Sequence, residues 1–485
     1  MLLEEIARHA KRQPNKTAYR NRTQALCYGE LWEKANRLAA YLEKEIGPVM
    51  IFGEKQVQMP IAFLACMIAG RPYLPIDPKQ PQERIEQIQR QAGAKTIICC
   101  GEYQSARQMG ATEIDSLCQI EREQTKAADN NPNRDVYWLF TSGSSGTPKG
   151  VRISMEALEN FVRWISSVRA VGDCIEGVTL NQAQFSFDLS VADLWPCFAA
   201  GGTVRALEWE EQRDFSSLYA AMRQSAAQRL TCTPSFARFC LCDRQFCREL
   251  LPNLKTIFFC GETLNANTVQ TLHERFAGLR VINAYGPTEA ACAVCAAEIP
   301  PGAQQIPVGE IKSAASEILI CSQDGKREQD GIAGEIVIVG ESVGNGYVGN
   351  LSGGFGERQG KRLYRTGDLG MIRNGLLWYL DRMDRQIKYK GYRIEPGEIE
   401  ETILSWKEVR TVAVLPVVKQ GEVRFLTAVV EWEGEPLPVS VCKERLLRCL
   451  PPYMQPKQWK TVEKIPMNER GKRDLHALER MLRNE

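Results

Sequence analysis

The stretch Tyr137-Trp-Leu-Phe-Thr-Ser-Gly-Ser-Ser-Gly-Thr-Pro-Lys-Gly-Val151 joins an apolar run to a loop of glycines and hydroxyls that closes with one lysine. The apolar run is typical of a buried strand. Glycines allow backbone N–H groups to approach an anion closely, and hydroxyls with an ammonium complete a cradle for phosphate oxygens. The stretch therefore predicts a site for a nucleotide polyphosphate. A flexible Gly/Ser surface loop is disfavoured, because linkers seldom follow a buried-strand pattern.

The loop is not a Walker A motif. That motif requires a glycine immediately before the lysine, and Pro148 stands there. A P-loop NTPase is therefore disfavoured.

Composition limits the class of protein. At 485 residues the chain is too long for one ordinary core, so we expect two or more domains. Lys+Arg 61 against Asp+Glu 59 leaves a net charge of +2, which disfavours nucleic acid as a partner. The longest apolar stretch, 61–70, is about half of what a bilayer requires, so membrane insertion is not expected. The N-terminus has early acids and no long apolar core, so no signal peptide is expected.

Seventeen cysteines are scattered through apolar segments, which is typical of free thiols in a reducing cytosol and predicts a cytoplasmic protein. One Cys-x-x-Cys occurs, Cys292/Cys295, without a second pair. The histidines, His9, His273 and His476, lie far apart in sequence. A zinc site and a Ser/His/Asp or Cys/His catalytic arrangement are therefore both disfavoured.

The first part of the chain alternates amphipathic helical patterns, such as 31–42, with short apolar strands, such as 49–52. This alternation predicts an α/β domain with mostly parallel strands. It continues with a helix near 154–168 and then strands, which we expect near 203–207, 228–232 and 255–260.

From about residue 305 short β-rich runs, including 334–339 and 375–380, predict a β subdomain. After Asp384 a basic strand over 385–393, a helix from Pro396 and a strand over 411–418 predict a separate C-terminal α+β module. The expected fold is α/β: a large N-terminal domain of α/β sheets plus a β subdomain, and a smaller C-terminal domain. The predicted boundaries are 1–380, a hinge at 381–384, and 385–485.

Two motifs near residue 340 lack the context that they require. The segment 340–344 matches a nucleophile elbow, and 344–349 matches a dinucleotide fingerprint. Both require a helix to begin at once, and the following Asn-Leu-Ser-Gly-Gly-Phe-Gly disfavours one. A hydrolase and a Rossmann oxidoreductase are therefore disfavoured.

Four other segments together indicate carboxylate activation. In 283–289 a tyrosine can stack on adenine and a carboxylate suits Mg²⁺. Asp368 lies on a turn where it can accept both ribose hydroxyls. Asp188 follows apolar residues, and a buried carboxylate needs a cation: a substrate ammonium or an internal arginine. Lys472 is expected on a flexible loop of the C-terminal module. It is either a functional lysine that reaches the site or a solvated lysine without a role.

The order of these segments resembles the adenylate-forming superfamily of acyl-CoA synthetases, luciferases and peptide-synthetase adenylation domains. The resemblance runs from 64–77 to Lys472. Within the superfamily the sequence is most similar to the D-alanine–D-alanyl carrier protein ligases. The segments that carry this likeness are 185–191, 233–236, 259–262 and 450–456.

The resemblance implies a role for each matching residue. Lys472 is the catalytic lysine that bridges the substrate carboxylate and the phosphate, Asp188 binds the substrate ammonium, and Glu289 lies near Mg²⁺. Asp384 is the hinge of a mobile C-terminal lid. The other implied ATP-site residues are Thr141, Ser142, Lys149, Asn283, Ala284, Tyr285, Gly286, Pro287, Thr288, Asp368, Tyr379 and Arg382, and the implied pocket residues are Cys260 and Cys292.

The implied reaction has two steps. The carboxylate of an amino acid attacks the α-phosphorus of ATP and pyrophosphate leaves, with Mg²⁺ as cofactor. The lid then rotates and presents 391–397, and the phosphopantetheine thiol of a separate carrier protein takes the acyl group.

Three departures from the ligase pattern leave the substrate open. Ala192 replaces an expected methionine, Ala284 a threonine and Cys292 a valine. Small changes in an apolar pocket can reassign specificity. The first candidate substrate is D-alanine, for cell-wall D-alanylation. The second is another small amino acid, for a secondary-metabolite pathway. An acyl-CoA synthetase is the rival class, which Asp188 disfavours because a simple acid has no ammonium. A non-catalytic relative is disfavoured because every catalytic position holds a competent residue.

Overall fold

A computed structural model of the chain divides it into two compact units. The larger unit comprises Met1–Pro78, Gln91–Leu139 and Gly150–Met383, and the smaller comprises Lys79–Arg90, Phe140–Lys149 and Asp384–Glu485. The predicted domain boundaries and the lid motion stay predictions. The structure describes residues 1–118, 131–143, 147–322, 324–351, 353–419, 422–467 and 473–483.

The first sheet of the larger unit is mainly parallel, as the α/β pattern predicts. Its strand order in the described residues is β14-β13-β12-β11-β9-β10-β1-β2, and only the outermost pairs, β13–β14 and β1–β2, are antiparallel. The strands expected near 203–207, 228–232 and 255–260 are confirmed as β10, β11 and β12. The strands are β1 (Thr17–Arg20), β2 (Ala25–Cys27), β9 (Val178–Asn181), β10 (Thr203–Ala206), β11 (Arg229–Cys232), β12 (Thr256–Phe259), β13 (Arg280–Tyr285) and β14 (Cys295–Ile299).

The second sheet of the larger unit has the order β6-β5-β3-β4-β7-β8 in the described residues. The chain passes into the smaller unit within β7 and returns within β8. Its core strands β3 and β4 are fully buried, as their continuous apolar character predicts. The strands are β3 (Val49–Phe52), β4 (Tyr73–Ile76), β5 (Thr96–Cys99), β6 (Thr112–Glu113), β7 (Asp135–Thr141) and β8 (Lys149–Ser154).

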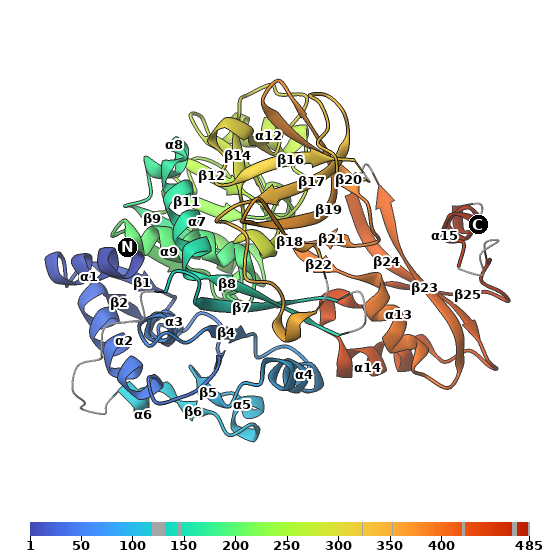
Figure 1. The fold of residues 1–485 in the computed structure, drawn as a ribbon, viewed down its shortest axis with the longest axis horizontal. Coiled ribbons are helices and arrows are strands. Elements are labelled where there is room, and N and C mark those ends of the chain that lie inside the picture. The colour runs from blue at the N-terminus through green and yellow to red at the C-terminus, as the bar shows by residue number, and fades with distance from the viewer. Residues whose placement is uncertain are drawn as a thin grey trace. The chain divides into compact units, whose positions relative to one another are not determined.

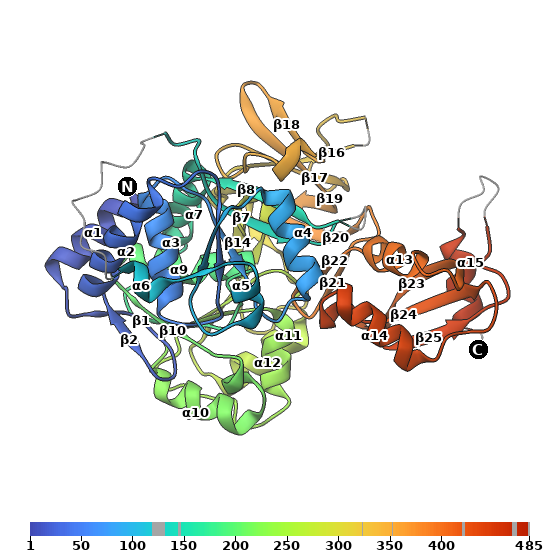
Figure 2. The same cartoon turned by 90° about the horizontal axis from the view of Figure 1, so that it is seen from below.

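Helices pack against these sheets in two apolar cores. One core contains α1 (Leu2–Arg12), α2 (Tyr28–Leu42), α3 (Gln58–Ile68), α7 (Met155–Ser167) and α9 (Val191–Ala199), and Figure 1 shows these helices in the same part of the larger unit. The other core contains α10 (Phe215–Ser225), α11 (Pro234–Leu241) and α12 (Ala266–Arg275), which lie together in Figure 2.

The β-rich runs after residue 305 form an antiparallel sheet of their own, which confirms the predicted β subdomain. Its order is β15-β20-β19-β17-β16, with β18 paired to β19. A β-bulge follows Leu369, and the register places Asp368 directly opposite Arg382. The strands are β15 (Gly309–Glu310), β16 (Glu317–Cys321), β17 (Gly334–Val339), β18 (Phe355–Arg358), β19 (Lys361–Arg373) and β20 (Leu376–Arg382).

The C-terminal part of the smaller unit has α+β structure, as predicted, with one correction. The single strand expected over 385–393 is wrong: the segment forms a hairpin of β21 and β22. Lys390 (φ 53°) and Gly391 (φ 84°) adopt left-handed conformations there, which turn the chain back on itself. The other elements are β21 (Ile387–Tyr389), β22 (Tyr392–Ile394), α13 (Pro396–Leu404), β23 (Val409–Lys419), β24 (Glu422–Trp432), α14 (Val439–Cys449), β25 (Gln458–Thr461) and α15 (Leu475–Arg483).

The remaining short elements agree with the sequence. Between β17 and β18 the described residues hold only one 3₁₀ turn, Val348–Asn350, so no α-helix follows the two motifs near residue 340. No helix in the described part of the chain is both long and apolar enough to cross a bilayer.

The start of α7 provides a stability test. The Ser154 hydroxyl is buried and accepts a hydrogen bond from the Ala157 N–H at 3.2 Å, so it caps the helix. Ser154→Ala removes this acceptor, which costs about 1 kcal/mol, and we expect roughly fivefold faster hydrogen exchange in the first turn of α7. Ser166→Ala, inside the same helix, is the matched control and should leave that turn unchanged. Equal exchange in both variants would contradict the capping role.

Candidate active site

The segment Tyr285–Cys292, which begins at the last residue of β13 in the larger unit, contacts several of the predicted functional groups of that unit. Its backbone allows few substitutions. A Cβ on Gly286 would lie 2.5 Å from the Ala293 Cα, so only glycine fits. Ala291 (φ 55°) and Cys292 (φ 80°) adopt left-handed conformations that side chains disfavour. Such strain is typical of functional loops held by their surroundings.

At Asp368 this segment meets the β subdomain. The Tyr285 hydroxyl donates to Asp368 Oδ2 at 2.5 Å, and Arg382 Nη1 donates to Oδ1 at 2.7 Å. The Tyr379 ring lies 6.4 Å from that of Tyr285. Because each carboxylate oxygen has two acceptor positions, each oxygen of Asp368 could accept one further hydrogen bond, as the predicted ribose contact requires.

Sequence reasoning missed Thr366, which orders this cluster. Its hydroxyl accepts from the Asp368 N–H at 3.0 Å, and its carbonyl accepts from Arg382 Nη1 at 2.9 Å. Burial, and then the charge of Asp368, raises the pKa of Tyr285 well above its usual value. Tyr285 therefore stays protonated and keeps its role as donor. Because side chains alternate along a strand, the sequence of β19 predicts that Thr366 and Asp368 lie on one face. It does not predict the hydrogen bond between them.

Asn283 leaves a buried acceptor free at the end of β13. Its Nδ2 donates to the Pro307 carbonyl at 2.9 Å. Its Oδ1 is buried and has no hydrogen-bond partner among the residues that the structure describes. A buried polar atom without a partner is costly, and a ligand amine such as that of adenine would satisfy it.

On the opposite side of the segment, Thr288 contacts the predicted ammonium-binding residue. Asp188 begins a 3₁₀ turn, Asp188–Ser190, and its Oδ2 accepts from the Thr288 hydroxyl at 2.5 Å. The expectation that Asp188 is buried is wrong, because its exposure is intermediate. The 3₁₀ turn ends the apolar segment at this residue.

The residues expected to shape the amino-acid pocket belong to one buried apolar cluster: Ala192, Cys260, Ala284 and Cys292. Cys260 follows β12, and its thiol lies 3.6 Å from the Cys292 carbonyl oxygen. The hydrogen bond with the Cys260 thiol and then burial raise the pKa of Cys292 well above the usual value. Small side chains at these positions limit the bulk that lines the cluster.

Glu289, the predicted metal residue, is fully buried in a 3₁₀ turn, Thr288–Ala290. Its Oε1 accepts from the Tyr347 hydroxyl at 2.7 Å, a partner that sequence reasoning missed. In the described parts of the chain no three His, Cys, Asp or Glu side chains gather as a metal site. Mg²⁺ commonly binds one or two carboxylates together with substrate phosphates, so a single glutamate is compatible with it.

The described residues of the predicted phosphate loop, 141–143 and 147–149, belong to the smaller unit. The Thr141 hydroxyl lies 3.5 Å from the Lys149 carbonyl, across the loop ends. The Ser142 hydroxyl donates to the Arg393 carbonyl at 2.6 Å, and the Gly143 N–H donates to Glu398 Oε2 at 3.3 Å.

Two other predicted residues relate to the smaller unit. The Asp384 carboxylate accepts from the Gln386 N–H at 3.1 Å, and its role as hinge stays a prediction. Lys472 lies outside the described residues.

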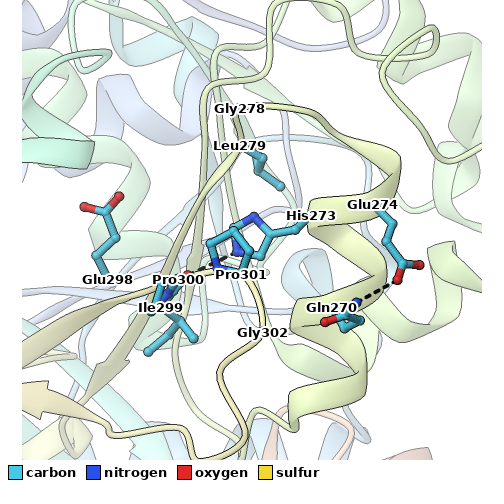
Figure 3. A pocket seen from close by; sticks show the side chains of 10 residues that line it. All are labelled: Gln270, His273, Glu274, Gly278, Leu279, Glu298, Ile299, Pro300, Pro301 and Gly302. Atoms are coloured by element: carbon cyan, nitrogen blue, oxygen red, sulfur yellow. Dashed lines mark hydrogen bonds between the residues drawn. The ribbon is translucent and has the colours of Figure 1, made fainter.

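A cavity of about 800 Å³ lies elsewhere in the larger unit, between α12 and the segment after β14 (Figure 3). His273 lines it, and its Nε2 lies 3.1 Å from the Ile299 carbonyl oxygen. None of the predicted site residues lines this cavity.

Comparisons with known proteins agree with the family and the fold. The model of the family described as AMP-binding enzyme matches residues 6–348. A D-alanine–D-alanyl carrier protein ligase of Bacillus licheniformis is 38% identical over 510 residues, covering 98% of each chain. One of Bacillus anthracis is 37% identical over 499 residues, again covering 98% of each.

A solved structure shows the same fold at lower identity. The Vibrio cholerae adenylation domain AlmE in complex with glycyl-adenosine-5'-phosphate has a TM-score of 0.85 at 22% identity, covering 100% of this chain and 98% of that chain. The chain belongs to the AMP-binding enzyme family. The predicted adenylate-forming superfamily, fold class and ligase-type enzyme are confirmed.

The thiols of this site give a labelling test. Cys292 is buried and its pKa is raised, whereas Cys242 is exposed. Because the thiolate is the form that reacts, iodoacetamide at neutral pH should modify Cys242 and spare Cys292 in the folded protein. Peptide mass spectrometry measures both, and labelling in denaturant is the control in which both react. Equal rates at the two cysteines in the folded protein would contradict the packing around Cys292.

Proposed function

We propose that this enzyme activates D-alanine, or a similar small amino acid, as its aminoacyl-adenylate and transfers it to a separate carrier protein. The observation that carries the proposal is that the segment Tyr285–Cys292 bonds to Asp368 through Tyr285 and to Asp188 through Thr288. One strained segment thus joins a carboxylate suited to ribose and a carboxylate suited to an ammonium.

The first step forms the adenylate from ATP. A carboxylate oxygen of the amino acid attacks the α-phosphorus, a new O–P bond forms, and the bond to the leaving pyrophosphate breaks. Asp188 holds the ammonium and Asp368 the ribose, while Asn283 Oδ1 accepts from the adenine amine. Positioning of this kind supplies much of the acceleration in phosphorus-centred displacements.

Cationic groups stabilise the charge that develops on phosphate oxygens in this step. In the proposal, Lys472 bridges the substrate carboxylate and the phosphate, and Lys149 with Thr141 and Ser142 grips the pyrophosphate. Mg²⁺, when bound near Glu289, would neutralise charge on the phosphates.

In the second step a phosphopantetheine thiolate attacks the acyl carbon, a thioester forms and AMP leaves. Movement about Asp384 would exchange Lys472 for the 391–397 region. We place the enzyme in the cytoplasm, which the seventeen free cysteines support.

D-alanine is favoured because the relatives at 37–38% identity are D-alanine–D-alanyl carrier protein ligases. The small residues Ala192 and Ala284 keep open a somewhat larger amino acid from a secondary-metabolite pathway. An acyl-CoA synthetase is the alternative from another class, and Asp188 argues against it because a simple acid offers no ammonium.

An exchange panel tests the substrate. ATP–pyrophosphate exchange should be fastest with D-alanine among D-Ala, L-Ala, Gly, Ser and larger amino acids, and absent with acetate, propionate or butyrate. Discrimination by one methylene is worth about 1–3 kcal/mol, so neighbouring amino acids should be slower by roughly ten- to 200-fold. Exchange with the simple acids and none with amino acids would favour the acyl-CoA synthetase.

The catalytic lysine has its own test. Lys472→Ala should abolish adenylate formation, because it removes the cation that bridges the reacting groups. The loss should exceed about a hundredfold in exchange rate, with circular dichroism and melting unchanged. Lys464→Ala, an exposed lysine nearby in sequence, is the matched control. Unchanged exchange in Lys472→Ala would overturn this mechanism.

A further inference from the structure

Lys55 is a buried lysine of the larger unit to which the proposed reaction assigns no role. It lies between β3 and α3, and its side chain is 2% exposed. An ammonium removed from water is costly unless hydrogen bonds and charges compensate it. Its contacts therefore indicate what it stabilises.

The contacts of the Lys55 ammonium converge on one short segment, Asn181–Phe185. Its Nζ donates to Asn181 Oδ1 and to the Ala183 carbonyl. It also lies 4.2 Å from the centroid of the Phe185 ring, a cation–π contact. This segment begins at the last residue of β9 and ends three residues before Asp188.

A buried carboxylate and a buried arginine extend the network to the other end of the same region. Asn181 Nδ2 donates to Asp193 Oδ2 at 2.8 Å. Arg229 Nη2 lies 3.8 Å from Asp193 Oδ1 and donates to the Ala192 carbonyl at 2.9 Å. Asp193 and Arg229 are both 0% exposed. The network thus holds the chain on both sides of Asp188, and at Ala192 it reaches the apolar cluster of the amino-acid pocket.

We propose that Lys55 is a positioning residue for the amino-acid site: it fixes Asn181–Phe185 and thereby holds Asp188 where it meets the substrate ammonium. This inference rests on the proposed function. Lys55 does not touch the substrate and acts through the segment that carries Asp188.

The charges around Lys55 make its effect depend on pH. Burial lowers the pKa of Lys55 to about 7, against the opposing charges of Asp193, Glu54 and Asp77. Burial raises the pKa of Asp193 to about 6, which Arg229 and Lys55 oppose. Lys55 is therefore charged below about pH 7 and loses its proton, and with it the cation–π contact, as the pH rises through that value. Its hold on the segment is strongest on the acidic side.

Lys55→Met tests the inference without an unpaired buried charge, because Asp193 and Arg229 remain as a pair. At about pH 6.5 we expect the KM for the amino acid to rise about tenfold in ATP–pyrophosphate exchange, as loss of hydrogen bonds from a charged group would cause. The KM for ATP should stay within about twofold, since the ATP site shares none of these contacts. Lys44→Met, an exposed lysine of the same unit, is the matched control.

A pH series separates positioning from general destabilisation. The ratio of variant to wild-type KM for the amino acid should shrink between about pH 6.5 and about pH 8.5, because the wild type loses the charge of Lys55. A parallel rise in the KM for ATP, a pH-independent ratio, or an amino-acid KM within about twofold of wild type would each overturn the inference.

Two further arms keep the result decisive. If Lys55→Met is poorly folded by circular dichroism, Lys55→Gln, which keeps a donor for the Ala183 carbonyl, replaces it and should give a smaller rise in the same KM. Asp188→Asn, with Lys55 unchanged, should raise the KM for the amino acid. Its ratio of variant to wild-type KM should not shrink between about pH 6.5 and about pH 8.5 as the Lys55→Met ratio does. If the wild type shows no exchange with any amino acid, the proposed function fails and this inference fails with it. If the wild type does exchange with amino acids but the Lys55 variants have the same KM for the amino acid, the inference alone fails.

Discussion

The left-handed turn at Ala291–Cys292 is the constraint on which the site of the larger unit depends. It reverses the chain after β13, so that Val294 and the residues after it pair antiparallel with Tyr285 and the end of β13. The side chains between them then face different neighbours: Thr288 faces Asp188, and Glu289 faces Tyr347. A change in that backbone would move Tyr285, Thr288 and Glu289 together, and with them their hydrogen bonds to three other segments of the unit.

Buried polar groups hold the elements around this turn. Asp368 receives hydrogen bonds from β13 and β20, so the β subdomain and the parallel sheet meet through one carboxylate. Lys55, Asp193 and Arg229 likewise form buried hydrogen bonds with residues on both sides of Asp188 in the sequence. Each group is costly to bury and is stabilised only by its partners, which makes the geometry specific.

In the smaller unit, residues distant in sequence hold the predicted phosphate loop. Glu398 of α13 is buried, accepts from the Gly143 N–H and pairs with Arg84. Burial raises the pKa of Glu398, which the charge of Arg84 opposes. The Ser142 hydroxyl and the Gly143 N–H are thus bonded to protein, and in the proposed reaction a polyphosphate that binds there would have to replace these bonds.

Much of the fold followed from the sequence. Apolar runs flanked by turn residues located β10, β11, β12 and β17, because local hydrophobic periodicity specifies such elements. The hairpin at Lys390–Gly391 was missed, since a lysine in a left-handed conformation leaves no signal in the pattern. The order of the motifs around Asp188, Asn283–Glu289 and Asp368 also identified the superfamily. Each motif contains a candidate functional residue together with local residues that the pattern of the superfamily shares.

Only the tertiary structure decided which of these groups meet. Tyr285 and Asp368 are separated by more than eighty residues in sequence, as their hydrogen bond records, and Lys55 is further still from Asn181. Propensity and periodicity act over a few residues, so they cannot specify such pairs. The sequence by itself determined the elements and the kind of chemistry. Long-range packing decided that Asp188 is partly exposed and that the buried Lys55 contacts the segment before Asp188.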